Sequence, residues 1–158
     1  MEWSDVIDNP TLAELPFKIE LNEWGNIEMS PASNLHGMLQ TAIAFNLKLL
    51  CDGGKAFVEC SIETRKNVKV ADVVWGSASF FARNGSETPF QESPEIVVEV
   101  ASPSNTVEEL LKKKELYFEK GAQEVWLCSE KGFMSFYGVN GQMNESPLCP
   151  SFPKAVEI

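Results

Sequence analysis

The segment PEIVVEVASPSNTVEELLKKKELY, residues 94–117, places a carboxylate in the middle of an apolar strand and follows it with a basic helix. Side chains of a strand alternate between its two faces, so Glu99 shares a face with Val97 and Ala101. Burying a carboxylate is costly unless it contacts a cation, a metal ion or several hydrogen-bond donors. The chain must therefore fold so that a partner reaches the centre of this strand.

A second carboxylate, Asp72, raises the same problem in the strand NVKVADVVWG, residues 67–76. If the two strands are neighbours, Asp72 and Glu99 could face one spot. Like charges repel at short range unless a divalent cation binds both, and hard carboxylate oxygens suit Mg²⁺ or Mn²⁺. The alternative is that a core lysine or backbone donors pair with each acid, and the pattern alone leaves both readings open.

Hydrophobic periodicity predicts an α+β fold, with a mixed central sheet flanked by helices. The expected elements are a hairpin over 17–21 and 27–29, a helix over 33–50, strands over 55–64, 67–76 and 95–102, a helix over 106–121, a strand over 124–129 and a final hairpin over 132–143. The polar residues 77–93 are expected to form a surface loop. We expect a single domain over residues 1–158, with residues 1–16 as a peripheral leader.

The helix over 106–121 carries three consecutive lysines. We expect Asn105 to cap it, with Glu108 completing a capping box. A helical wheel gives an apolar stripe of Val107, Leu110, Leu111, Tyr117 and Phe118. The wheel places Lys114 near the middle of that stripe, Lys113 at its edge and Lys112 toward solvent. The wheel singles out Lys114, yet a lysine at the edge of the stripe can reach a cleft, so Lys113 and Lys114 both stay candidates.

The net charge of -10 argues against a protein that coats nucleic acid without sequence preference. Acidity fits a metal site, a focused DNA site or a protein partner equally well. No apolar run reaches the ~20 residues of a membrane span, and the start MEWSDVIDNP does not resemble a signal peptide. The four cysteines lack CxxC spacing, which favours free thiols in a reducing compartment. We therefore expect a cytoplasmic protein.

Other polar residues are weaker candidates. His36, the single histidine, is expected to be a capping or surface residue rather than a phosphate contact. Arg65, Lys66 and Lys69 lie between two strands, where they could contact a nucleic-acid backbone or simply form a polar turn. Glu63 could be an accessory ligand.

Four segments together resemble one known family. They are IEMSP before the first helix, VADVVW, the proline-led strand PEIVVEVASPS, and KKELYFEKGAQEVWL, which combines a Lys-x-x-x-Tyr helix, a glycine and a strand with tryptophan. Their combination, over residues 17–130, is similar to the bacterial Uma2 family (DUF820), which is related in fold to the PD-(D/E)XK superfamily. This resemblance implies a restriction-endonuclease-like core of order αβββαβ with an N-terminal β-hairpin.

The resemblance also implies roles for individual residues. Asp72 and Glu99 would be the metal-binding carboxylates, with the backbone carbonyl of Val100 as a further ligand. In the superfamily the lysine usually lies two residues after the glutamate, where this chain has Ala101. The Uma2 family, which this chain resembles, instead carries the lysine on the next helix, four residues before the tyrosine. That position is Lys113, with Lys114 as its replacement.

The activity implied is metal-assisted hydrolysis of phosphodiester bonds in DNA, with Mg²⁺ or Mn²⁺ as cofactor. A homodimer would suit double-strand cleavage, which needs two centres. Two alternatives remain: a catalytically degenerate nuclease fold that binds nucleic acid or protein, and a structural protein whose buried acids are paired internally.

Overall fold

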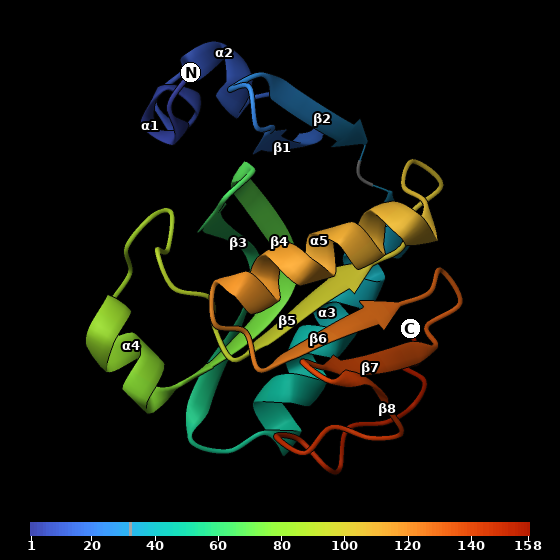
Figure 1. The fold of residues 1–158 in the computed structure, drawn as a ribbon. Coiled ribbons are helices and arrows are strands. Elements are labelled where there is room, and N and C mark those ends of the chain that lie inside the picture. The colour runs from blue at the N-terminus through green and yellow to red at the C-terminus, as the bar shows by residue number, and fades with distance from the viewer. Residues whose placement is uncertain (32) are drawn as a thin grey trace.

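The protein is described from a computed structural model, which covers residues 1–31 and 33–158. It contains a six-stranded mixed sheet and a separate two-stranded hairpin, with helices around them (Figure 1). The elements are α1 (Trp3–Ile7), α2 (Pro10–Ala13), β1 (Phe17–Leu21), β2 (Ile27–Pro31), α3 (Asn34–Leu50), β3 (Gly54–Thr64), β4 (Asn67–Ser77), α4 (Ala78–Asn84), β5 (Ile96–Val100), α5 (Val107–Glu119), β6 (Glu124–Cys128), β7 (Met134–Gly138) and β8 (Gly141–Met143). The predicted α+β class, mixed sheet and N-terminal hairpin are confirmed.

The order of the large sheet is β3-β4-β5-β6-β7-β8. The β4–β5 pair is antiparallel, whereas β5 and β6 are parallel, with Glu99 opposite Leu127. A parallel pair needs a crossover connection, and α5 supplies it. Since β4 and β5 are neighbours, the strands that carry the two buried acids lie side by side at the centre of the sheet.

Two hydrophobic cores lie on opposite faces of this sheet. On one face, α3 packs against residues of β4, β5, β6 and the C-terminal segment. On the other face, Tyr117 of α5 and Phe80 of α4 pack against alternate residues of the same strands. Figure 1 shows α5 and α3 on opposite sides of β5 and β6. Each central strand is therefore covered on both faces, which explains its nearly continuous apolar sequence.

The side chains of β3 and β4 stop alternating regularly between the two faces of the sheet near Asp72. Val74 belongs to the core under α5 and Val73 to the core under α3, as alternation requires, but Ala71 also belongs to the core under α5. Regular alternation would put Ala71 and Val73 on one face. On the facing strand Glu59 has a φ of 56°, an uncommon conformation for a residue other than glycine. Regular side-chain alternation is therefore interrupted on both strands at the level of Asp72.

Two local predictions on the segment before β5 and on α5 were wrong. Residues 78–84 form α4 rather than a loop, because Ser77 caps the helix and Phe80 is fully buried in the core under α5. The cap of α5 is Thr106, not Asn105, and Glu109 completes the capping box.

The expected apolar stripe of α5 also differs from the structure. Val107 is exposed, and the buried residues are Leu110, Leu116 and Tyr117. Shifting the stripe in this way turns Lys113 toward the sheet. Among the described residues, none of the helices combines the length and apolar character needed to cross a bilayer.

Two glycines give a paired test of this packing. A Cβ at Gly54 would collide with the carbonyl of Gly76 and the ring of Trp75, whereas a Cβ at Gly37, inside α3, meets open space. We expect Gly54→Ala to lower the free energy of unfolding by about 1–3 kcal/mol and Gly37→Ala to raise it by about 0.5–1 kcal/mol. Urea denaturation measures both, and changes of the same sign would contradict the packing described.

Candidate active site

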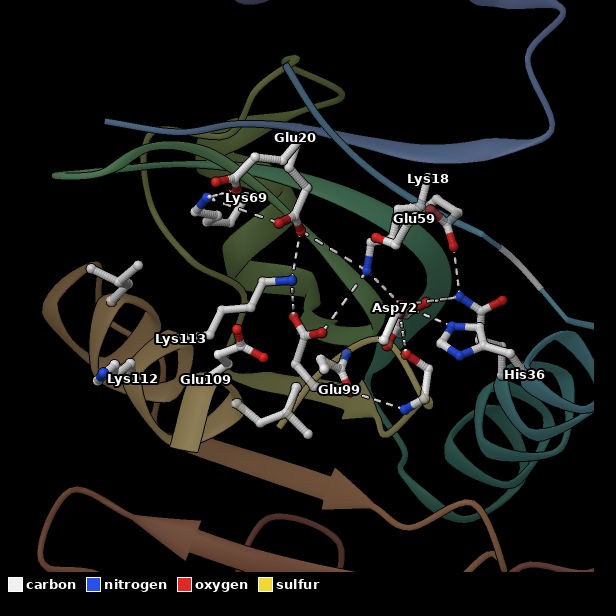
Figure 2. A pocket seen from close by; sticks show the side chains of 18 of the residues that line it. Lys18, Glu20, His36, Glu59, Lys69, Asp72, Glu99, Glu109, Lys112 and Lys113 are labelled. Atoms are coloured by element: carbon white, nitrogen blue, oxygen red, sulfur yellow. Dashed lines mark hydrogen bonds and ion pairs between the residues drawn. The ribbon is translucent and has the colours of Figure 1, made fainter. Parts of the chain in front are cut away.

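A cavity of about 720 Å³ opens between the hairpin β1–β2, the start of α3, the centre of the sheet and α5. Its lining includes Asp72, Glu99 and Lys113. Figure 2 shows their charged groups pointing toward one another, joined by Lys18 and Glu20 of β1. The cavity thus brings together side chains from β4 and β5 of the large sheet, from the crossover helix α5 and from the separate hairpin β1–β2.

Asp72 is almost completely buried and has a partner on each oxygen. Its Oδ2 accepts a hydrogen bond from the backbone N–H of Val100 at 2.7 Å. Its Oδ1 accepts one from Lys18 Nζ at 2.6 Å and lies 3.1 Å from His36 Nε2. Burial by itself would raise the pKa of this carboxyl, but Lys18, His36 and Lys113 outweigh burial and hold the pKa well below its usual range. Asp72 is therefore a stable anion.

Glu99 is equally buried but is held differently. The Tyr117 hydroxyl donates to Oε1 at 2.6 Å, and Lys113 Nζ lies 3.0 Å from the same oxygen. Lys18 Nζ is 3.9 Å from Oε2. Burial raises the pKa of Glu99, and the attraction of the two lysines does not cancel that rise. The same cavity thus contains one carboxyl with a lowered pKa and one with a raised pKa.

Lys113 lies between two carboxylates. Its Nζ donates to Glu20 Oε1 at 2.6 Å and contacts Glu99. Burial would lower the pKa of Lys113, but the attraction of Glu20, Glu99 and Asp72 is stronger and raises it above the ordinary lysine value. Lys113 is therefore held as an ammonium ion.

The other two lysines of α5 point elsewhere. Lys114 Nζ pairs with Glu115 at 2.6 Å and lies 5.5 Å and 5.2 Å from the ring centres of Phe118 and Tyr137. Lys112 pairs with Glu108 on the exposed side of the helix. Of the two lysines left open by the helical wheel, Lys113 is the one whose ammonium reaches the carboxylates.

The two predicted acids converge on one point. Lys18 Nζ contacts Oδ1 of Asp72 and Oε2 of Glu99, so these oxygens are no farther apart than the two contact distances together. The peptide of Val100 borders the same point through its amide. The structure therefore places Asp72, Glu99 and Lys113 together in the cavity, while their roles stay predictions. Val100, whose carbonyl was the predicted ligand, contacts Asp72 through its amide N–H.

Three further residues at this point, Lys18, Glu20 and Gln40, were missed from the sequence, and a fourth, His36, was assigned another role. Lys18 and Glu20 lie two apart on β1, and both side chains enter the cavity. His36 and Gln40 lie one turn apart on α3, and both reach Asp72 Oδ1, Gln40 at 3.4 Å. Two sequence patterns point to these residues. Side-chain alternation along FKIEL puts Lys18 and Glu20 on one face of a strand, and the i, i+4 spacing puts the polar residues His36 and Gln40 on one face of a helix.

His36 was expected to cap α3 or lie on the surface, and its side chain does neither. Ser33 caps the helix by accepting a hydrogen bond from the His36 backbone N–H. The imidazole is therefore free to turn to Asp72, whose hydrogen bond raises the pKa of His36 against the opposing effect of burial.

The remaining sequence candidates differ in position. Lys69 is buried, and its Nζ donates to the Leu21 carbonyl at 3.0 Å and contacts Glu28 at 3.2 Å. It therefore fastens the hairpin to β4. Arg65 and Lys66 line the cavity mouth. Glu63 is not among the lining residues.

The cavity fits a divalent cation in its donor chemistry. Mg²⁺ is commonly held by one or two carboxylates, with water and phosphate oxygens completing its coordination, and Asp72 and Glu99 offer such a pair. Over the part of the chain that is described, no group of three or more His, Cys, Asp or Glu side chains is assembled as a metal site. Instead the Lys18 ammonium contacts both carboxylates. The residues fit a cation if Lys18 moves aside.

Comparison with known proteins identifies a family and a solved structure of related fold. The family model Uma2, described as "Putative restriction endonuclease", matches residues 11–151. A crystal structure described as "a putative nuclease belonging to DUF820 from Anabaena variabilis" superposes with a TM-score of 0.63 at 17% identity, covering 87% of this chain and 75% of that one. At this identity the likeness shows a shared fold. No curated protein matches.

The opposite pKa directions of Asp72 and Glu99 predict opposite effects on stability. Asp72 stabilises the fold as an anion, an effect present above its unfolded pKa of about 3.9 and lost as pH falls toward the lower folded value. Asp72→Asn should therefore lower the free energy of unfolding by roughly 3–5 kcal/mol near pH 7, and the deficit should shrink below about pH 4.

Glu99 has the reverse sign. Because its folded pKa is raised, its ionisation costs stability as pH rises above the unfolded value of about 4.3. Glu99→Gln, its neutral counterpart, should equal or exceed the wild type in unfolding free energy near pH 7. Urea denaturation at pH 4, 5.5 and 7 compares the two variants, and an equal loss in both at pH 7 would refute the assignment.

Proposed function

The chain belongs to the Uma2 family, and from that premise we propose that it is a metal-dependent endonuclease that hydrolyses phosphodiester bonds of DNA with Mg²⁺ or Mn²⁺. The family and the nuclease fold support a nuclease-like function. The observation that carries the finer proposal is the meeting of Asp72, Glu99 and Lys113 in one cavity.

Asp72, Glu99 and the carbonyl of Val100 would hold the cation. When bound, a divalent cation polarises a phosphate and lowers the pKa of water at the site. Asp72 is already an anion, because its pKa is low. A cation beside Glu99 would favour its ionised form and reverse the effect of burial on its pKa.

Lys113 would stabilise charge rather than abstract a proton. Its raised pKa keeps the ammonium protonated at neutral pH, so it is unsuited to act as a general base. An ammonium beside the phosphate can offset the negative charge that builds up in the transition state. Tyr117, whose hydroxyl donates to Glu99, fixes the orientation of that carboxylate.

Substrate binding has to take place in an acidic protein. The cations at the cavity mouth are ion-paired with exposed glutamates: Arg65 with Glu119, Lys66 with Glu23 and Lys112 with Glu108. Exposed ion pairs contribute only about 0–1 kcal/mol, so a phosphate backbone can replace these carboxylates at small cost. We therefore expect DNA binding that is weak and falls steeply with salt.

A second function, a catalytically degenerate binding module, is favoured by one observation. The Lys18 ammonium contacts both acids, as a bound cation would. A purely structural role would require partners for the buried acids within the chain. Lys18, Lys113 and Tyr117 are such partners. Activity and cation binding, rather than further geometry, separate these roles from the enzyme.

The proposed activity is tested on supercoiled plasmid and on single- and double-stranded oligonucleotides with Mg²⁺ or Mn²⁺. We expect wild-type protein to nick or degrade DNA, and chelation by EDTA to abolish this. Glu99→Gln should lower the rate by about 100-fold or more, as loss of a charge-stabilising group does. Wild-type protein that is inert with every metal and substrate, while folded, would favour the binding module.

The neighbouring lysines of α5 provide a matched pair for the same assay. Lys113→Met removes an ammonium that contacts Glu99, whereas Lys114→Met removes one that contacts Glu115 and two aromatic rings. We expect Lys113→Met to lower the cleavage rate by about 100-fold and Lys114→Met to change it less than about threefold. Loss of activity in Lys114→Met alone would show that the wrong lysine has been assigned.

A further inference from the structure

Lys18 takes a position that the proposed activity does not explain. Its Nζ is 2.6 Å from Asp72 Oδ1, 3.9 Å from Glu99 Oε2 and 4.0 Å from Glu20 Oε1, and its side chain is 14% exposed. A divalent cation held by Asp72 and Glu99 would contact the same oxygens. One ammonium ion and one metal ion cannot both occupy that point.

The charges around this point favour exchange. Three carboxylates, of Glu20, Asp72 and Glu99, face the ammonium groups of Lys18 and Lys113, and Lys69 Nζ also lies 3.9 Å from Glu20 Oε2, so the resting cluster is close to balanced. A divalent cation added to both lysines would leave an excess of positive charge. Lys113 keeps Glu20 as a partner at 2.6 Å, whereas Lys18 is 4.0 Å from Glu20. Lys18 is therefore the ammonium that can leave with least disturbance.

Removing Lys18 from the acids would loosen a distinct part of the fold. Lys18 lies on β1, which pairs with β2 in a sheet separate from the large one (Figure 1). The hairpin is tied to β4 through Lys18 and Asp72, through Glu20 and the Val70 N–H at 2.8 Å, and through Lys69 and the Leu21 carbonyl. Breaking the first tie weakens the hold of the sheet on the hairpin.

We propose that Lys18 is a built-in counter-cation that competes with the divalent ion for Asp72 and Glu99, so that binding of the ion releases Lys18 and loosens the hairpin β1–β2. The inference rests on the proposed cation site and adds a regulatory contact to it. It gives the two converging acids a counter-charge from within the chain. It also makes the local stability of the hairpin depend on whether a cation occupies the site.

The test measures Mn²⁺ binding to the full chain by isothermal calorimetry, without DNA. Lys18→Met keeps most of the apolar stem and removes the charge, so it should bind Mn²⁺ roughly 5- to 150-fold more tightly than wild type. Lys66→Met is the matched control, because Lys66 also lines the cavity but pairs with Glu23 at its exposed mouth. Its Mn²⁺ affinity should change less than about twofold.

A second measurement uses the wild type and does not depend on how well a variant folds. Saturating Mn²⁺ should speed amide hydrogen exchange in residues 17–31 and slow it in residues 96–100. Equal Mn²⁺ affinity of wild type and folded Lys18→Met, or unchanged exchange in the hairpin at saturation, would overturn the role of Lys18 and leave the cation site standing. Failure of both proteins to bind Mn²⁺ would overturn the cation site and the inference together.

Discussion

The structure depends on how two buried carboxylates are neutralised at the centre of a sheet. Removing a carboxylate from water is expensive, and the cost is offset only by close opposite charge and well-placed hydrogen bonds. Asp72 and Glu99 draw these from β1, α3 and α5, through Lys18, His36, Lys113 and further donors. These three elements must therefore meet the strands β4 and β5 at one point, so the acids constrain the fold as strongly as they define the cavity.

Much of the fold follows from the sequence because its signals are local. Period-two and period-3.6 patterns located the central strands and the two long helices, and a carboxylate within an apolar strand marked Glu99 as unusual. Where tertiary packing decided the outcome, local signals failed. The polar stretch before β5 contains α4 because Phe80 packs into the core under α5. The residue that caps α5 is Thr106, one position after the predicted Asn105.

Some residues of the candidate site were also predicted from the sequence, whereas others were found only in the structure. The strand pattern marked Asp72 and Glu99, the family resemblance selected Lys113, and the structure brings the three together. The wheel singled out Lys114 because Val107 was counted in the apolar stripe, whereas in the structure Val107 is exposed and Leu116 is buried. Alternation in FKIEL places Lys18 and Glu20 on one face of β1, but it does not show that this face meets Asp72 and Glu99, because that contact comes from a hairpin that folds back across β4. Spacing in sequence does not encode such a contact, and only the three-dimensional pairing reveals it.

The contrast between the two acids bears most directly on function. A structural ion cluster would gain from holding every carboxyl firmly ionised, as Asp72 is. Glu99 instead has a raised pKa despite two nearby lysines and a tyrosine hydroxyl, so this fold does not fully compensate its charge. A carboxyl whose pKa is perturbed by burial and by nearby charges in a cavity is a candidate functional group. The proposed cation would add the positive charge that favours the ionised form of Glu99, and the proposed release of the Lys18 ammonium would make room for it.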